Sequence, residues 1–170
     1  MQLIAETTRL IIREITVEDA QAIFNLNQDP LVIKYTSDPA FKSVEDASKL
    51  IEENIRFQYR EYGIGRWAVI AKHDHSFLGW CGLKFRTETN EIDLGYRYFQ
   101  HAWGKGYATE AAQACLKYGL HTKKLQRIIG CAMQPNVASI KVLEKCGMTF
   151  CRYDFLHGHE AVVYEKVAQS

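Results

Sequence analysis

Ten residues in the second half of the chain, Trp103–Ala112, constrain its fold most, because they form a glycine-rich stretch between a strand pattern at Glu91–Phe99 and a helix pattern. The first backbone N–H groups of a helix lack internal partners and lie at the positive end of its dipole. Gly104 and Gly106 have no Cβ, which lets a phosphate approach the backbone closely, and Lys105 adds a charge. The segment therefore predicts a ligand that carries phosphate groups.

Length and composition set the limits of that prediction. The chain has 170 residues, which fits one domain over residues 1–170, and its net charge is +1 from 21 basic and 20 acidic residues. A balanced charge gives no field that would hold nucleic acid or an anionic membrane. No apolar run is long enough to span a bilayer, and the start shows no charged-then-apolar leader, so we expect a cytoplasmic protein. The five cysteines form no C-x-x-C pair, so we expect reduced thiols.

The order of the predicted elements is typical of a mixed sheet that carries helices, in the α/β or α+β class. Thr16 with Asp19 and Ser43 with Asp46 match capping boxes that open two helices, the second of which ends at Gly63. Three strands before the glycine-rich stretch, joined by polar turns, indicate an antiparallel meander. The predicted strands are Arg9–Glu14, Arg66–Lys72, Phe77–Phe85, Glu91–Phe99, Arg127–Met133, Met148–Leu156 and Glu160–Val167.

Two common phosphate-binding motifs do not fit this stretch. A nucleotide-hydrolysing loop of the form G-x-x-x-x-G-K-[ST] would need a glycine five residues before Gly104, and there is none. A dinucleotide loop would need a third glycine where Thr109 stands and a parallel β-α-β unit upstream. A tight turn with no ligand also explains a lone G-x-G.

Four further segments, taken in order with this stretch, resemble the GNAT N-acetyltransferases, and most closely the RimJ/RimL branch, which includes acetylases of ribosomal-protein N-termini. The resemblance covers nearly the whole chain. The segments that carry it are Thr8–Arg13, Leu94–Tyr96, Trp103–Ala111, Asn136 with Ser139, and Leu143–Met148.

The resemblance implies a strongly twisted mixed sheet of six to seven strands, flanked by about four helices. Its fourth and fifth strands, Glu91–Phe99 and Arg127–Met133, would splay apart and admit acetyl-CoA between them. Gly95 would mark a bulge or kink in the fourth strand, although a glycine there also simply weakens a strand.

The resemblance also implies the residues that bind the cofactor. Residues 103–108 correspond to the family's pyrophosphate loop, with Trp103 in the place of its basic or amide residue. The backbone of residues 96–98 would pair with the pantetheine arm like an added strand. Asn136 would bond the same arm, or serve as a helix N-cap. The expected cofactor-binding residues are Tyr96, Arg97, Tyr98, Trp103, Gly104, Lys105, Gly106, Tyr107, Ala108, Thr109, Asn136 and Ser139.

The implied chemistry is direct transfer of acetyl to an amine that has lost its proton. Asp93 falls where many relatives carry glutamate, and Glu91 lies on the same strand face, so both are candidates for the base. The alternative for each carboxylate is a solvated charge beside Arg97 with no catalytic role. Ser139 matches the serine that protonates the leaving thiolate in the RimL-like branch, and it also fits an ordinary helix serine.

Three functions remain open from the sequence: an N-acetyltransferase, a non-catalytic acyl-CoA sensor of the same fold, and a nucleotide-binding protein. The acceptor amine of the first would be a protein N-terminus or a small molecule such as an amino acid, a polyamine or an aminoglycoside. The two His-x-His pairs supply too few ligands to predict a metal site. We expect a monomer or a homodimer, the latter through the last strands.

Overall fold

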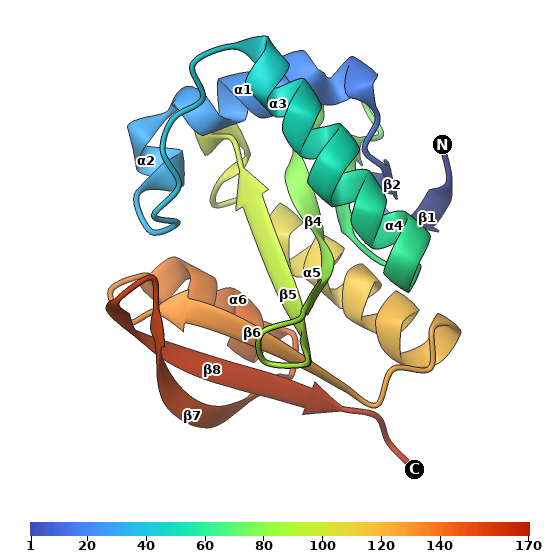
Figure 1. The fold of residues 1–170 in the computed structure, drawn as a ribbon. Helices are drawn as coiled ribbons and strands as arrows, with labels where there is room; N and C mark the ends of the chain where they lie inside the picture. Colours follow the sequence, from blue (N-terminus) through green and yellow to red (C-terminus); the bar gives the residue numbers. More distant parts are fainter.

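A mixed eight-stranded sheet runs through the computed structural model, which describes residues 1–170 (Figure 1). The strand order is β1-β2-β3-β4-β5-β6-β8-β7, and every neighbouring pair is antiparallel except the parallel pair of β5 and β6. The strands are β1 (Leu3–Glu6), β2 (Leu10–Glu14), β3 (Arg66–Ala71), β4 (Phe77–Arg86), β5 (Glu91–Tyr98), β6 (Arg127–Met133), β7 (Thr149–Leu156) and β8 (His159–Val167).

Capping residues in the sequence mark where several of the helices begin and end. The capping boxes at Thr16 and Ser43 are present, and Gly63 ends its helix with a left-handed φ of +67°. A π-helical turn at Ile51–Ile55 joins α3 to α4 in one continuous rod. No helix has the length and apolar character needed to cross a membrane. The helices are α1 (Ala20–Gln28), α2 (Pro30–Ile33), α3 (Val44–Leu50), α4 (Arg56–Tyr62), α5 (Tyr107–Lys117) and α6 (Val137–Lys145).

Helices cover the two faces of the sheet unequally. The larger core, which includes Leu83, Leu94 and Ile128, lies between the sheet and the helices α5 and α6. The smaller core, around Ile23 and Ile70, lies under α1 and α3 on the opposite face. Figure 1 shows no helix on that opposite face in front of β6, β8 and β7. We call this face of β5, β6, β8 and β7, turned away from α5 and α6, the open face.

Three features of the fold differ from the sequence-based expectations. The sheet has eight strands because Leu3–Glu6 adds an edge strand to β2, and α2 adds a short helix that begins at Pro30. The bulge expected at Gly95 is absent, because β4 and β5 pair in continuous register and Gly95 lies opposite Gly82. Gly95 instead makes room for a side chain, since a Cβ there would lie 2.6 Å from the guanidinium carbon of Arg66.

The cysteines form no disulfide. Cys81, Cys115 and Cys146 are buried, while Cys131 and Cys151 are partly exposed. All three buried cysteines lie in the larger core, where the sulfurs of Cys81 and Cys115 are 3.7 Å apart. Burial raises the pKa of Cys146 to about 12, so this thiol is protonated at neutral pH.

Candidate active site at the splay between β5 and β6

The strands β5 and β6 are paired at a single position, Asp93 with Ile129, and they part beyond it (Figure 1). The edge of β5 from Leu94 to Tyr98 therefore has no strand neighbour on the β6 side. This is the splay that the family resemblance implied for these two strands. It leaves backbone groups of residues 96–98 available to an extended ligand, while the side chain of Tyr98 is buried in the core.

The segment before α5, Trp103–Gly106, is an exposed loop with unpaired backbone donors, and we call it the phosphate loop. Gly104 and Gly106 have φ values of +69° and +80°, in the left-handed region that favours glycine. The N–H groups from Gly104 through Thr109 donate no hydrogen bond within the protein. Successive free N–H groups at the start of an 11-residue helix form a cradle that fits a pyrophosphate.

The phosphate loop is braced from both sides. The indole Nε1 of Trp103 donates to the carbonyl of Tyr98 at 2.9 Å and ties the loop to the end of β5. On the other side, Arg9 Nη1 donates to the carbonyl of Lys105 at 2.8 Å, and its guanidinium lies 4.4 Å from the ring centroid of Tyr107. The same arginine pairs with Glu110 at 2.7 Å. Trp103, which the resemblance places at the family's basic or amide position, thus makes an anchoring contact within the protein.

Across the splay, the helix α6 presents Ser139 to β5. The Tyr96 hydroxyl donates to the carbonyl oxygen of Ser139 at 2.8 Å, and its oxygen lies 3.0 Å from the Ser139 hydroxyl. Asn136 caps the helix, since its side chain accepts from the Ser139 N–H at 3.3 Å. Burial raises the pKa of Tyr96 above its ordinary value, so this phenol stays protonated. The two hydroxyl groups form one hydrogen-bonded pair in the gap between β5 and α6.

The two candidate carboxylates share a strand face but have different partners. Both oxygens of Glu91 are bound: Oε1 by Arg127 at 2.9 Å and Oε2 by Arg152 at 3.0 Å. These hydrogen bonds, with that of Arg152 the strongest cause, lower the pKa of Glu91 to about 2 despite its burial. Asp93 is 7% exposed, and only its Oδ2 is bound, by Arg66 at 2.9 Å. Neither carboxylate pairs with Arg97, the neighbour expected from the sequence.

The acetyltransferase (GNAT) domain family matches residues 9–149 of the chain. The chain therefore belongs to the GNAT acetyltransferase family. The uncharacterized N-acetyltransferase p20 of Bacillus licheniformis is 31% identical over 91% of this chain and 85% of its own length. The structure of a GNAT acetyltransferase from Bacillus anthracis superposes with a TM-score of 0.82 at 27% identity, covering 98% of both chains. RimL, the ribosomal L7/L12 α-N-protein acetyltransferase in complex with coenzyme A, shares the fold with a TM-score of 0.85 at 17% identity, over 98% of both chains.

Family membership makes this chain an acetyl-transferring enzyme that uses acetyl-CoA. The GNAT fold and the splay between its strands confirm the architecture that the resemblance implied. The assignments of single residues to the cofactor or to proton transfer stay predictions, and the free N–H groups of the phosphate loop are the feature of this chain that best fits them.

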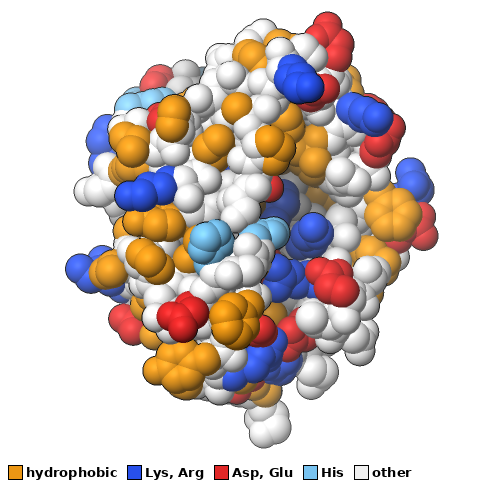
Figure 2. Space-filling view, turned by 60° about the vertical axis from the view of Figure 1, so that its left-hand side comes forward, with side chains coloured by type: hydrophobic (Ala, Val, Ile, Leu, Met, Phe, Trp, Pro, Cys, Tyr) orange, Lys and Arg blue, Asp and Glu red, His pale blue; other side chains and the backbone are white.

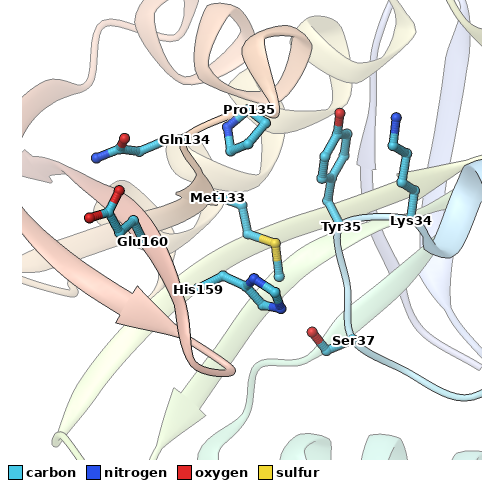
Figure 3. A pocket seen from close by; sticks show the side chains of 8 residues that line it. All are labelled: Lys34, Tyr35, Ser37, Met133, Gln134, Pro135, His159 and Glu160. Atoms are coloured by element: carbon cyan, nitrogen blue, oxygen red, sulfur yellow. The ribbon is translucent and has the colours of Figure 1, made fainter.

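A cleft of about 380 Å³ opens on the open face, at the C-terminal end of β6. Figure 3 shows Met133 and His159 pointing across it toward the segment of Tyr35 and Ser37, which follows α2. Figure 2 shows that Lys, Arg and His side chains gather around a hollow on this side of the molecule. His159 belongs to the second His-x-His pair of the sequence, and it lines this cleft.

The side chain of Arg97 joins β5 to the segment that borders the cleft. It donates to Asn27 at 2.9 Å and to Asp38 at 2.6 Å, and its guanidinium lies 5.3 Å from the ring of Trp80. Its Nε is buried without a partner. The resemblance implied only a backbone contact for this residue, and the structure adds side-chain bonds that hold Asp38, next to the cleft residue Ser37.

The contacts that the arginines around the splay make were not predicted from the sequence. Arg66 donates to the carbonyl oxygens of Gly82 and Asp93 and to the Asp93 carboxylate, so it lies flat over β4 and β5. Its one sequence signal is Gly95, which leaves space for the guanidinium, whereas Gly82 makes room for the backbone of Gly65. Arg9 fell within the Thr8–Arg13 resemblance, but nothing in the sequence connects it to a loop 96 residues away.

Proposed function

We propose that this acetyltransferase modifies the α-amine of a peptide or protein N-terminus, by direct transfer from acetyl-CoA bound at the splay. The observation that carries the proposal is the shortage of free carboxylate at the splay. Glu91 has both oxygens bound by arginines, and Asp93 has one oxygen left, Oδ1, that makes no hydrogen bond within the protein. Such a site holds a weak base, which suits an amine that loses its proton easily.

The cost of deprotonation separates the two main kinds of amine. At pH 7 an α-amine of pKa near 8 needs about 1.4 kcal/mol to lose its proton, whereas a lysine amine of pKa near 10.4 needs roughly 4.6 kcal/mol. Asp93, acting through its free oxygen directly or through water, is adequate for the first and weak for the second. RimL, which shares the fold, is an α-N-protein acetyltransferase by name, in line with this proposal.

Each part of the site has a task in this proposal. The free N–H groups from Gly104 through Thr109, with Lys105, bind the pyrophosphate of the cofactor. When bound, acetyl-CoA supplies the thioester whose acetyl group is transferred. A backbone N–H near Tyr96 meets the negative charge that develops on the acetyl oxygen. Ser139 gives a proton to the departing sulfur, and Tyr96 orients the Ser139 hydroxyl from 3.0 Å.

A panel of matched amines tests the proposal. We would incubate the protein with acetyl-CoA and one of three acceptors: a peptide with a free N-terminus, the same peptide N-terminally blocked but containing lysine, and a polyamine. Mass spectrometry of the products avoids background from the partly exposed thiols of Cys131 and Cys151. We expect acetylation of the first peptide at a rate at least tenfold above the second. Preferred acetylation of lysine or polyamine would refute the α-amine assignment.

The alternative function, a non-catalytic acyl-CoA sensor of the same fold, would give a different result. A sensor would be stabilised against heat by acetyl-CoA and CoA yet acetylate no amine in the panel. Stabilisation by ATP but not by acetyl-CoA would contradict cofactor binding at the phosphate loop altogether. A small-molecule acceptor would show as turnover of free amino acids or aminoglycosides with little turnover of peptides.

A further inference from the structure

Five arginines lie on or reach the open face of the sheet, which carries Asp93, and four of them have a carboxylate partner. Arg86 has none within 4.0 Å, and its guanidinium contacts only the sulfur of Cys131, at 3.6 Å from Nη1. The paired guanidiniums are those of Arg66 with Asp93, Arg97 with Asp38, Arg127 with Glu165 and Arg152 with Glu91.

The contact with Cys131 places the guanidinium of Arg86 at the splay. Arg86 ends β4 opposite Glu91, so its side chain starts on the same face as those of Glu91 and Asp93. Its contact with Cys131 shows that the guanidinium reaches across β5 to β6, beyond the last position at which these strands pair. Met133, which lines the cleft, lies two residues further along β6 on the same face, about 7 Å away.

The charge of Arg86 is retained and its donors are available. Burial opposes the charged form, but the nearby carboxylates of Asp93 and Glu88, with the contact to the Cys131 sulfur, outweigh it and raise the pKa of Arg86. A guanidinium has five N–H donors, and here one of them makes a weak contact with a thiol. No nitrogen of Arg86 is buried without a partner, so the remaining donors reach the surface.

We propose that Arg86 binds a carboxylate of the acceptor, so that the enzyme selects amines with an acidic group near the reacting nitrogen. The inference rests on the proposed function, since it needs the amine to approach Asp93 from the open face. A guanidinium binds a carboxylate through two parallel hydrogen bonds, which adds orientation to attraction. The carboxylate belongs either to an acidic side chain near a peptide N-terminus or to a free amino acid.

Two matched pairs of acceptors distinguish these sources. One pair is a peptide beginning Ser-Glu and the same peptide beginning Ser-Gln; the other is a free amino acid and its amide. For the wild-type enzyme we expect the acidic member of at least one pair to have a kcat/KM about tenfold higher, mainly through KM. The pair that shows the preference identifies the source of the carboxylate.

Substitutions then test whether Arg86 is responsible. In Arg86→Gln the ratio of kcat/KM between acidic and neutral acceptors falls to near one, and in Arg86→Lys part of it remains. Lys84→Gln is the matched control, because Lys84 is an exposed cation on the same strand and the same side of it. We expect Lys84→Gln to change the ratio less than twofold. An equal loss in both variants, or an unchanged ratio in Arg86→Gln, would overturn the proposal.

A binding measurement keeps the inference separate from the proposed function. Calorimetry in the presence of CoA compares the Ser-Glu and Ser-Gln peptides and needs no turnover. Tighter binding of the acidic peptide that disappears in Arg86→Gln supports the Arg86 site even if no amine is acetylated, in which case the proposed function alone fails. Acetylation of both peptides with equal kcat/KM and equal affinity refutes the Arg86 site and leaves the proposed function intact.

Discussion

Replacement of Ser139 by alanine is the sharpest test of the proposed proton transfer. The substitution removes one hydroxyl, which lies 3.0 Å from the Tyr96 oxygen. The backbone contacts at this position survive it, because Tyr96 donates to the Ser139 carbonyl and Asn136 accepts from the Ser139 N–H. A loss of activity in Ser139→Ala therefore reports on the hydroxyl rather than on the start of α6.

The expected loss follows from the acidity of the leaving group. A thiol of pKa near 8.5 gains about 2 kcal/mol on protonation at pH 7, so removal of its donor slows the reaction by at most about 30-fold. Water can donate the proton in place of Ser139 with lower efficiency. We therefore expect kcat to fall about tenfold to 30-fold while KM for acetyl-CoA changes less than about threefold. Ser139→Thr, which keeps a hydroxyl, should recover most of the rate.

Tyr96→Phe extends the test, because the phenol acts through Ser139. We expect a smaller fall in kcat, and the double variant should be no slower than Ser139→Ala alone, since two residues acting through one hydroxyl are not additive. Single-turnover kinetics, followed by mass spectrometry, would establish that acetyl transfer limits the measured rate. A transfer rate in Ser139→Ala within twofold of wild type would refute Ser139 as the proton donor.

Three other substitutions address separate parts of the site. Asp93→Asn should move the pH profile of kcat/KM toward higher pH, and an unaltered profile would argue against Asp93 as the base. Glu91→Gln should lower the free energy of unfolding, measured in urea, by about 1–2 kcal/mol at pH 7, because it weakens the pairs with Arg127 and Arg152 at a partly exposed position. The pKa of Glu91 is lowered from 4.5 to about 2, so the difference in unfolding free energy between wild type and Glu91→Gln is full above pH 4.5 and is lost as the pH falls toward 2. A difference that does not depend on pH would contradict its origin in the ion pairs. Arg9→Ala should raise KM for acetyl-CoA about tenfold with a smaller change in kcat, because it releases the phosphate loop, and an unchanged KM would show that the loop needs no brace.

Features fixed by neighbouring residues were predictable from the sequence. The turn before α5 needs two left-handed residues, and glycines stand at both, Gly104 and Gly106. The strand Arg127–Met133 has the bounds expected from its pattern. The capping boxes at Thr16 and Ser43 formed because each depends on a residue three positions away. A local φ requirement or a short-range hydrogen bond restricts the residue type at a given position, so it can be recognised in the sequence.

Features that depend on distant partners were not predictable. The strand Leu3–Glu6 is short and half-exposed, and it exists because it pairs with β2 at the edge of the sheet. The expectation of a bulge at Gly95 was wrong for a related reason. The space next to this glycine is occupied by the side chain of Arg66, which comes from a different strand. Neither the edge pairing nor the position of that guanidinium can be derived from the residues around it.

The two carboxylates show why the choice of a candidate base depends on the structure. Alternation along a strand places Glu91 and Asp93 on one face and treats them alike. Glu91 is held by Arg127 and Arg152, which are 36 and 61 residues away, and these partners occupy both of its oxygens. Asp93 is held by one arginine through one oxygen, at the last position where β5 still pairs with β6. A base needs an oxygen that can accept a proton at the point where the strands part, and of these two side chains only Asp93 offers one.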